Sequence, residues 1–450
     1  MTRPLGSFGR VNPPATRVMP VHEAIGILKA AGAVPAMTML PYGNGRSNGD
    51  SCQNRDGAVV DMRALDRIRD FDPELGLLTA EAGVLLSDVI AHAAPFGFFP
   101  AVVPGTRFVT VGGAIANDVH GKNHHRRGTF GCHVESLELM RSDGKVYRCS
   151  RDDNAGLFAA TLGGMGLTGI ILSATLRLMR VPALDVAEQV TPLAGLDQYF
   201  DLAEAADAAN EYAVAWIDQL ATGRNAGRGL LLTGNHAPEP ATARRPAGRK
   251  SVPFQPPVNV LNRPFLSVFN AAYRWSRSRQ AGVHTTAWEK FFFPLDGVRD
   301  WNRLYGPKGL FQHQSVIPPE AARRTIPALL HAAREAGQGS FLTVLKRFGA
   351  APSPGMLSFP RPGYTLTLDF PNRGAGTLAL LDELDAITIA AGGAVNPYKD
   401  ARMSAATFGA SFPNWERLEA VRDPVFMSSF WQRTAMRLKT HDDVTLRAAE

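Results

Sequence analysis

The chain has 450 residues, of which 45% are hydrophobic and 20% are charged, and this composition excludes a wholly disordered protein. Lysine and arginine number 48 against 41 aspartate and glutamate, and the net charge of +7 suits anionic partners without selecting one class of them. The three cysteines form no C-x-x-C pair, which argues against a disulfide framework and against a cysteine zinc site.

Hydrophobic runs in the sequence bear on where the protein resides. The N-terminal segment lacks the apolar core of a signal peptide. No stretch reaches the roughly 18 uninterrupted apolar residues that a membrane-spanning helix requires. We therefore expect a protein of the cytoplasm, or one bound peripherally at the cytoplasmic membrane.

The first 180 residues alternate between strands and short helices. Apolar residues at helical spacing predict helices over 21–31 and 86–94. Short apolar runs bounded by turn residues predict strands over 35–40, 57–62, 76–81, 135–141, 145–149 and 167–180. The turn Ser142-Asp143-Gly144 joins two of these strands as a hairpin.

From about residue 183 the pattern changes to longer helices between strands. The predicted strands are 213–217, 229–233, 312–317, 341–346 and 364–370, and the predicted helices are 318–336 and 375–391. This order indicates an α+β domain in which helices cover one face of an antiparallel sheet. We expect residues 183–393 to form this domain, and residues 394–450 to return as short helices to a first domain of residues 1–182.

The stretch 236–282 differs from its surroundings. It is rich in proline and carries eight lysine or arginine residues against one acidic residue, with aromatic residues interleaved. One interpretation is a flexible surface excursion of the second domain. The other is a basic and aromatic patch for an anionic membrane surface. Nucleic acid is not favoured, because no recognition-module signature accompanies the charges.

Three glycine-rich loops lie within the first 182 residues. The segment 41–50, PYGNGRSNGD, allows successive backbone N–H groups to point at one anion. It does not match a Rossmann fingerprint, because the next predicted element is a strand and not a helix. Similar loops occur at 103–113 and 163–169. Three such loops in one domain indicate a large ligand that carries a diphosphate and planar rings.

The motifs together resemble one flavoprotein family. They lie at 43–50, 104–107, 111–125, 166–171, 301–307, 312–318, 357–360, 399–402 and 423–424, and the run His120-Gly-Lys-Asn-His-His125 is the most specific of them. The chain resembles the vanillyl-alcohol-oxidase type of FAD-binding (PCMH-type) proteins, and within it the members that oxidise a polyprenylphosphoryl ribose. The resemblance implies a two-part FAD-binding domain of that type and an α+β substrate domain with an antiparallel sheet.

The resemblance also implies an activity. An FAD-dependent oxidoreductase would oxidise the 2-prime hydroxyl of a polyprenylphosphoryl-β-D-ribose to a 2-keto sugar. A partner reductase using NAD(P)H would then complete the epimerisation to the arabinose donor for cell-envelope arabinan. Two alternatives stay open: a soluble aldonolactone or alditol oxidase on the same fold, and a non-catalytic membrane- or anion-binding protein.

The residues expected to contact FAD follow from the loops and from the resemblance. They are Tyr42, Gly43, Asn44, Gly45, Arg46, Ser47, Asn48, Gly49, Gly105, Thr106, Thr110, Gly112, Gly113, Ala116, Asn117, Val119, His120, Gly166, Gly169, Ile171 and Asn396. Relatives that attach the flavin covalently often carry a histidine in the first loop. Ser47 and Asn48 occupy that place here, so we expect FAD to be bound non-covalently.

Chemical roles are expected for two residues above all. We expect the His120 side chain to lie where the flavin and the sugar meet. Lys399 is expected to hold the sugar hydroxyl or phosphate. The substrate-binding candidates are Lys122, Tyr305, Gln312, Gln314, Lys346, Thr365 and Thr367. Gln312 and Gln314 should face the same way, because side chains alternate along a strand.

Several positions depart from the family pattern, and one pair of residues resembles a metal site. Thr367 stands where mycobacterial members carry a reactive cysteine, and Thr365 stands where they tend to have asparagine. Asn48 and Asn396 replace aromatic residues. No metal is expected at His124 and its neighbour, because adjacent histidines seldom converge and a third ligand is not evident.

Overall fold

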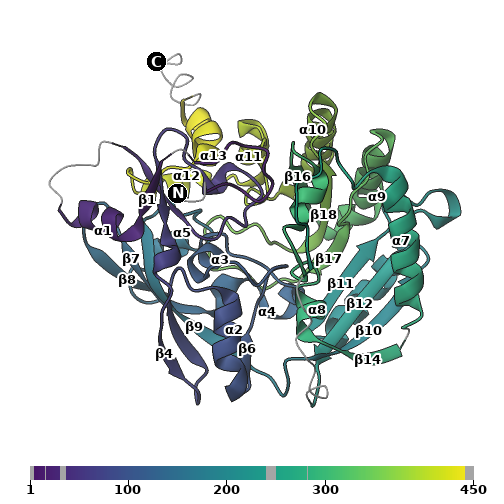
Figure 1. Ribbon diagram of the computed structural model, residues 1–450, viewed down its shortest axis with the longest axis horizontal. Coiled ribbons are helices and arrows are strands. Elements are labelled where there is room, and N and C mark those ends of the chain that lie inside the picture. Colours follow the sequence, from purple (N-terminus) through teal and green to yellow (C-terminus); the bar gives the residue numbers. More distant parts are fainter. Residues whose placement is uncertain (1–4, 16, 31–36, 240–249, 281, 441–450) are drawn as a thin grey trace.

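The computed structural model describes residues 5–15, 17–30, 37–239, 250–280 and 282–440, and two bodies of sheet and helix lie side by side (Figure 1). The chain begins with a small three-stranded sheet in the order β1-β3-β2, whose neighbours run parallel. Its elements are β1 (Val18–Pro20), α1 (Val21–Lys29), β2 (Met39–Tyr42) and β3 (Ala58–Asp61). The first glycine loop directly follows β2.

A six-stranded antiparallel sheet forms the rest of the first body, with strand order β4-β5-β9-β7-β8 and β6 paired to β9. Its strands are β4 (Ile68–Asp72), β5 (Leu77–Glu81), β6 (Phe98–Pro100), β7 (Val134–Met140), β8 (Val146–Ser150) and β9 (Ile170–Arg180). The helices of this part are α2 (Leu86–Ala93), α3 (Val111–Ala116), α4 (His124–Arg127) and α5 (Ala155–Thr161). Val111, Ala114 and Ile115 of α3 are fully buried in the core of this body, which fixes the second glycine loop against the sheet.

The second body is built on an eight-stranded antiparallel sheet in the order β14-β10-β12-β11-β17-β18-β16-β19. Its strands are β10 (Val186–Leu193), β11 (Tyr212–Ile217), β12 (Gly229–His236), β14 (Gly282–Thr286), β16 (Leu310–Ile317), β17 (Val344–Phe348), β18 (Gly363–Pro371) and β19 (Ala394–Val395). The predicted antiparallel sheet is therefore confirmed. It is larger than expected, because β10, β14 and β19 were not predicted.

The two faces of this sheet differ in chemistry. On β18, Leu366, Leu368 and Phe370 lie in the apolar core beneath the helices α6 (Leu196–Ala209), α9 (Pro319–Glu335) and α10 (Ala375–Ala390). Thr365 and Thr367 alternate with them and point to the other face, because successive side chains on a strand alternate. The helices α6, α9 and α10 cover one face, as predicted. The opposite face is polar at β16 and β18, whereas over β10 and β12 it is apolar and is covered by another helix of residues 263–278.

The stretch 236–282 is more regular than the sequence interpretation allowed. Within it lies α7 (Arg263–Ser278), a 16-residue helix packed on β10 and β12. The short strand β13 (Lys250–Ser251) pairs with β15 (Val298–Arg299), and α8 (Trp288–Phe292) follows β14. The sequence analysis did not predict α7, which buries Leu266 and Asn270. Arg244, Arg245 and Arg249 lie outside the described residues.

After β19 the chain continues as short helices that pack beside the first body. The helices of this segment are α11 (Ala405–Ser411), α12 (Trp415–Val421) and α13 (Ser429–Arg433). Arg433 pairs with Asp50 beside the first glycine loop, with a distance of 2.8 Å from Nε to Oδ2. Among the described residues, no helix combines the length and the apolar character needed to cross a bilayer.

Candidate active site

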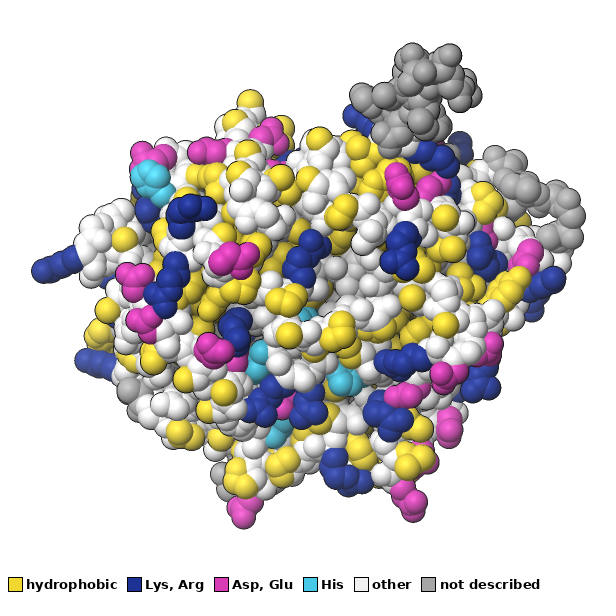
Figure 2. All heavy atoms as spheres, turned by 180° about the vertical axis from the view of Figure 1, so that it is seen from behind, with side chains coloured by type: hydrophobic (Ala, Val, Ile, Leu, Met, Phe, Trp, Pro, Cys, Tyr) yellow, Lys and Arg dark blue, Asp and Glu magenta, His cyan; other side chains and the backbone are white. Residues whose placement is uncertain are grey.

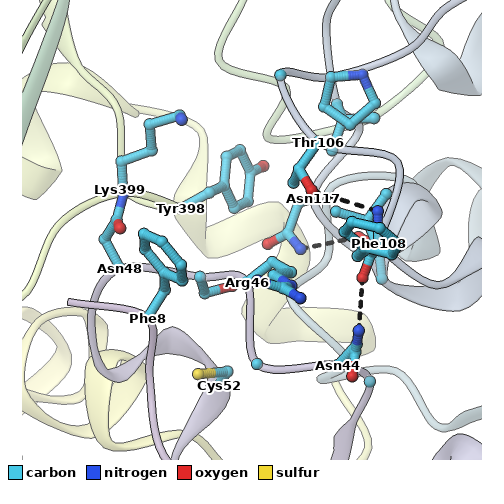
Figure 3. A pocket seen from close by; sticks show the side chains of 18 of the residues that line it. Phe8, Asn44, Arg46, Asn48, Cys52, Thr106, Phe108, Asn117, Tyr398 and Lys399 are labelled. Carbon is cyan, nitrogen blue, oxygen red and sulfur yellow. Dashed lines mark hydrogen bonds between the residues drawn. The ribbon is translucent and has the colours of Figure 1, made fainter. Parts of the chain in front are cut away.

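A cavity of about 560 Å³ opens between the two bodies, a volume typical of small-molecule sites. The glycine loops of the first body form one side, and the polar face of the eight-stranded sheet forms the other. In Figure 3, Lys399 and Tyr398 enter from one side, Asn117 and Thr106 from the opposite side.

Most of the residues predicted to bind FAD line this cavity. They are Gly43, Asn44, Gly45, Arg46, Ser47, Asn48, Gly105, Thr106, Thr110, Gly112, Gly113, Ala116, Asn117, Val119, His120, Gly166, Gly169, Ile171 and Asn396. A Cβ added at Gly105 would meet no atom within 4 Å, so this backbone is open to close approach by a ligand. Gly45 has a φ of 61°, which a side chain would strain. The glycine walls and the hydroxyl, amide and guanidinium donors fit a flavin dinucleotide.

A chain of hydrogen bonds that begins at a backbone N–H fixes His120. The N–H of Tyr398 donates to Asn396 Oδ1 (3.0 Å), so the amide nitrogen of Asn396 faces Gln314 and donates to its Oε1 (2.9 Å). Gln314 Nε2 in turn donates to Thr365 Oγ1 (2.9 Å) and to His120 Nε2 (3.1 Å). His120 Nε2 is therefore an acceptor, and the ring proton lies on Nδ1.

The other side of the His120 ring meets a lysine. Lys346 Nζ lies 2.9 Å from His120 Nδ1 and donates to the carbonyl oxygen of Gly121 at 3.0 Å. Burial lowers the pKa of Lys346 to about 7, helped by the charge of Lys399, and burial also lowers the pKa of His120 well below its ordinary value. A neutral Lys346 amine can accept a hydrogen bond from the Nδ1–H group, so both ring nitrogens are engaged by the protein.

A second chain of polar contacts runs parallel to the first. Asn48 Nδ2 donates to Gln312 Oε1 at 2.8 Å, and Gln312 Nε2 donates to Asp369 Oδ1. Asp369 is fully buried, burial raises its pKa to about 6, and its Oδ2 has no hydrogen-bond partner among the described residues. Burial lowers the pKa of Lys399, while the charge of Asp369 opposes that shift. The cavity thus holds a carboxylate with an unused oxygen near a lysine.

The predicted substrate residues are divided between the cavity and its surroundings. Gln312, Gln314, Lys346 and Thr367 line it together with His120 and Lys399. The expected common direction of Gln312 and Gln314 is thereby confirmed. Thr365 is not among the lining residues, and it lies behind Gln314, where its hydroxyl holds the glutamine amide.

Four more predicted residues do not line the cavity, namely Lys122, Tyr305, Tyr42 and Gly49. Lys122 donates to the carbonyl oxygen of Phe291 and lies 4.4 Å from the centre of its ring. Tyr305 is buried in a small apolar cluster. The Tyr42 hydroxyl donates to Gly6 at 2.7 Å.

Gly49 was predicted to contact FAD, and the structure gives a different reason for this glycine. A Cβ at this position would lie 1.5 Å from the carbonyl oxygen of Asp400, so the residue is glycine because the return segment packs directly on it. Its role is to let the loop that carries Lys399 approach the first glycine loop.

Sequence reasoning missed several lining residues. Asp369 was detectable, since it lies two positions beyond Thr367 on the same strand and therefore on the same face. Phe8, Asp296, Arg299 and Trp301 also line the cavity. Phe8 and Asp296 come from irregular segments, while Arg299 ends the two-residue strand β15 and Trp301 begins a short 3-10 helix, elements too short to show periodicity in the sequence.

The paired histidines do not form a metal site in the described chain. The ring of His124 packs 4.6 Å from that of Phe348, measured between centres, and burial lowers the pKa of His124 to about 3. His125 instead lies beside Asp207, 3.5 Å from Nδ1 to Oδ1. No group of three His, Cys, Asp or Glu side chains suited to a metal ion occurs among the described residues.

Comparisons with known proteins agree with this geometry. An FAD-binding domain model matches residues 21–150. The chain is 34% identical over 453 aligned positions to a decaprenylphosphoryl-beta-D-ribose oxidase of Mycolicibacterium smegmatis, and the match covers 96% of this chain and 97% of that protein. The chain belongs to this family of FAD-dependent oxidoreductases. FAD is therefore the cofactor, and the glycine-lined part of the cavity is where the described residues fit it.

Other relatives share only part of the chain. L-gulonolactone oxidase of Mus musculus is 33% identical over 151 residues, which is 33% of each chain. Cytokinin dehydrogenase 7 of Oryza sativa is 30% identical over 195 residues, covering 40% of this chain and 36% of that protein. These partial matches are to proteins named for other substrates. A match over this part of the chain alone therefore does not identify a substrate.

Proposed function

We propose that the protein oxidises the 2-prime hydroxyl of a polyprenylphosphoryl-β-D-ribose to the 2-keto sugar. The observation that carries this proposal is the pair of lysines, Lys346 and Lys399, at the sheet side of the flavin cavity. Burial lowers the pKa of each of them, so an anionic group that enters would favour the charged form of Lys399, while Lys346 stays the neutral partner of His120. A phosphorylated sugar meets this requirement, and the near full-length relative is named for such a substrate.

When bound, FAD supplies the acceptor for the hydride that leaves C2 of the sugar ring. The residues of this chain orient the alcohol and take its proton. His120 cannot receive that proton directly, because Gln314 and Lys346 occupy its two ring nitrogens. Its role is to hold the polar face rigid, and Lys399 holds the sugar hydroxyl or the phosphate.

We propose Asp369 as the group that accepts the hydroxyl proton. Its Oδ1 is held by Gln312, while Oδ2 has no hydrogen-bond partner among the described residues. A pKa near 6 leaves the carboxylate ionised at neutral pH, yet basic enough to take a proton in the transition state. One bond from C2 to hydrogen and one from oxygen to hydrogen break, and the carbonyl forms as the proton moves to Oδ2.

The proposal includes two partners. The 2-keto product is a substrate for a reductase that uses NAD(P)H and delivers hydride from the opposite face, which completes the epimerisation to arabinose. The prenyl chain of the substrate stays in a bilayer, so the enzyme works at an anionic membrane surface.

Anaerobic flavin reduction tests the substrate class. The holoenzyme is mixed with farnesylphosphoryl-ribose, free ribose or arabinonolactone, and the loss of flavin absorbance is followed. We expect rapid bleaching by the prenyl phosphate sugar alone. Bleaching by arabinonolactone or by free ribose at an equal rate would contradict the proposal and favour a soluble aldonolactone or alditol oxidase.

A further inference from the structure

Large hydrophobic side chains that face solvent are concentrated in one segment of the described chain. Scattered single examples are normal on a soluble surface, but a concentration of them marks a contact site. Exposed fractions in this segment range from 43% to 72%. The residues are Phe254, Val258, Phe265, Val268, Trp275 and Val283.

Three of these residues lie on α7, whose inner face is firmly held. Asn270 is buried and donates from Nδ2 to Asp218 Oδ1 at 2.8 Å, and the ring of Tyr273 packs 5.0 Å from that of Trp216. The exposed Val268 and Trp275 are seven positions apart, close to two helical turns, and therefore share the outer face. The apolar outer face belongs to a formed and anchored helix.

The charges beside this face have one sign. Residues 250–283 include five lysine or arginine residues and no aspartate or glutamate. Arg279 stacks on the ring of Trp275 at 3.8 Å, while Arg277 is held by Glu188 of β10. On the face of the molecule shown in Figure 2, by contrast, basic and acidic side chains are intermixed.

This segment is continuous with the wall of the cavity. Val252 donates its N–H to the carbonyl oxygen of Arg299 at 3.0 Å, extending the pairing of β13 with β15. Arg299 and Trp301 line the cavity, and Trp301 packs in the same cluster as Leu266 of α7. The segment that carries the exposed apolar side chains therefore packs directly against Arg299 and Trp301, which line the cavity.

We propose that the outer face of residues 254–283 docks on an anionic lipid bilayer, an inference that rests on the proposed lipid-linked substrate. Tryptophan, phenylalanine and valine side chains enter the headgroup region, as in interfacial amphipathic helices, and the arginines meet lipid phosphates. The prenyl chain then stays in the bilayer while the sugar passes the short distance into the cavity.

Vesicle flotation of the FAD-loaded full chain tests this surface without any substrate. Vesicles of phosphatidylcholine alone are compared with an equal mixture of phosphatidylcholine and phosphatidylglycerol. We expect flotation with the anionic vesicles alone, weakened by salt. The double variant Val268→Gln, Trp275→Gln should need at least about tenfold more lipid for half-maximal binding, because both side chains leave the bilayer.

A matched control variant replaces two exposed apolar side chains that lie far from α7. Leu75, in the turn between β4 and β5, and Val146, the first residue of β8, are 60% and 48% exposed. The strands β4 and β8 lie on the opposite side of the molecule from α7 (Figure 1). The double variant Leu75→Gln, Val146→Gln should float like the unchanged protein. Flavin bleaching by farnesylphosphoryl-ribose should be equal in all three proteins, which verifies that the α7 variant is folded.

Three outcomes would overturn the docking surface. The unchanged protein could fail to bind anionic vesicles, or the α7 variant could float as well as the control. A fall in molecular mass in the α7 variant, with vesicle binding unchanged, would show that the face joins two copies of the chain. An error in the proposed substrate would be distinguishable from an error in the docking surface. In that case farnesylphosphoryl-ribose would not bleach the flavin, although the protein would still bind the vesicles.

Discussion

Asp369 combines three properties that set it apart on the polar sheet face. It lines the cavity, it keeps one carboxylate oxygen without a partner among the described residues, and burial raises its pKa to about 6. Gln312 and Asn48 connect it to the first glycine loop, so its position follows that of the flavin-binding wall. At the scale of one residue, these properties are the reason for proposing this carboxylate as the acceptor of the hydroxyl proton.

The variant Asp369→Asn should lower kcat/KM by roughly 10²–10⁴-fold, because the amide cannot accept the hydroxyl proton. In the unchanged enzyme, activity should rise with pH through about 6, since the raised pKa keeps the carboxyl protonated and inactive below that value. The variant should lose this acidic limb. Its FAD content should be unchanged, and a variant with a normal pH profile would show that another group is the base.

Cys52 bears on how the flavin is held. Its thiol lines the cavity, but burial and the charge of Asp50 raise its pKa to about 12, so it stays protonated and unreactive. His120 has both ring nitrogens engaged. We expect all FAD to be released into the supernatant when the protein is denatured by acid or heat. Flavin absorbance that remains with the precipitated polypeptide would contradict this expectation.

At the scale of elements, the contact between two loops positions Lys399. Gly49 of the first loop packs against the backbone of Asp400, the residue that follows this lysine. The bond from Asn396 N–H to the carbonyl oxygen of Gln314 (2.8 Å) ties the start of the same loop to β16. The lysine is thus held between the two bodies by backbone contacts.

Replacement of Gly49 by alanine should displace the Lys399 loop, because a Cβ cannot lie 1.5 Å from a carbonyl oxygen. We expect a loss of substrate affinity and a weakened retention of FAD, measured by flavin reduction titrations and by gel filtration. The matched variant Gly156→Ala, in α5, adds a Cβ that meets no atom within 4 Å. It should retain full flavin content, and equal behaviour of the two variants would refute the packing role.

The elements were largely predictable from the sequence, and the exceptions have physical causes. Apolar periodicity located α9, α10 and the strand that carries Gln312 and Gln314, because these elements bury one regular face. The helix α7 was missed, since proline and arginine in the stretch around it resembled a loop. The site residues on glycine loops were found, whereas Trp301 was not, because its place depends on the pairing of β13 with β15.

At the scale of the whole molecule, a network of buried ion pairs joins the two bodies. Arg433 contacts Asp50 at 2.8 Å and Asp400 at 2.6 Å. Arg402 pairs with Asp385 of α10, which also lies 3.2 Å from His313 of β16. The network runs from the first glycine loop through the return segment to the helix layer of the large sheet.

The variant Arg433→Gln should reduce the free energy of unfolding by roughly 3 kcal/mol, because it leaves buried Asp50 without its cation and Asp400 with only the more distant Arg402, at 3.7 Å. Differential scanning calorimetry of the FAD-loaded protein measures this loss. The exposed Arg437, four residues further on, supplies the control, and Arg437→Gln should leave the melting temperature unchanged. Similar melting temperatures for both variants would show that the network adds no stability.

The return of residues 394–433 to the first body also governs the order of events in biosynthesis. Every glycine loop leaves the ribosome long before Lys399, Asp400 and Arg433 have been made, and these residues complete the cavity. Flavin is therefore retained only after translation is nearly finished. Until then the glycine loops form one open wall of the site, without the side chains that close it.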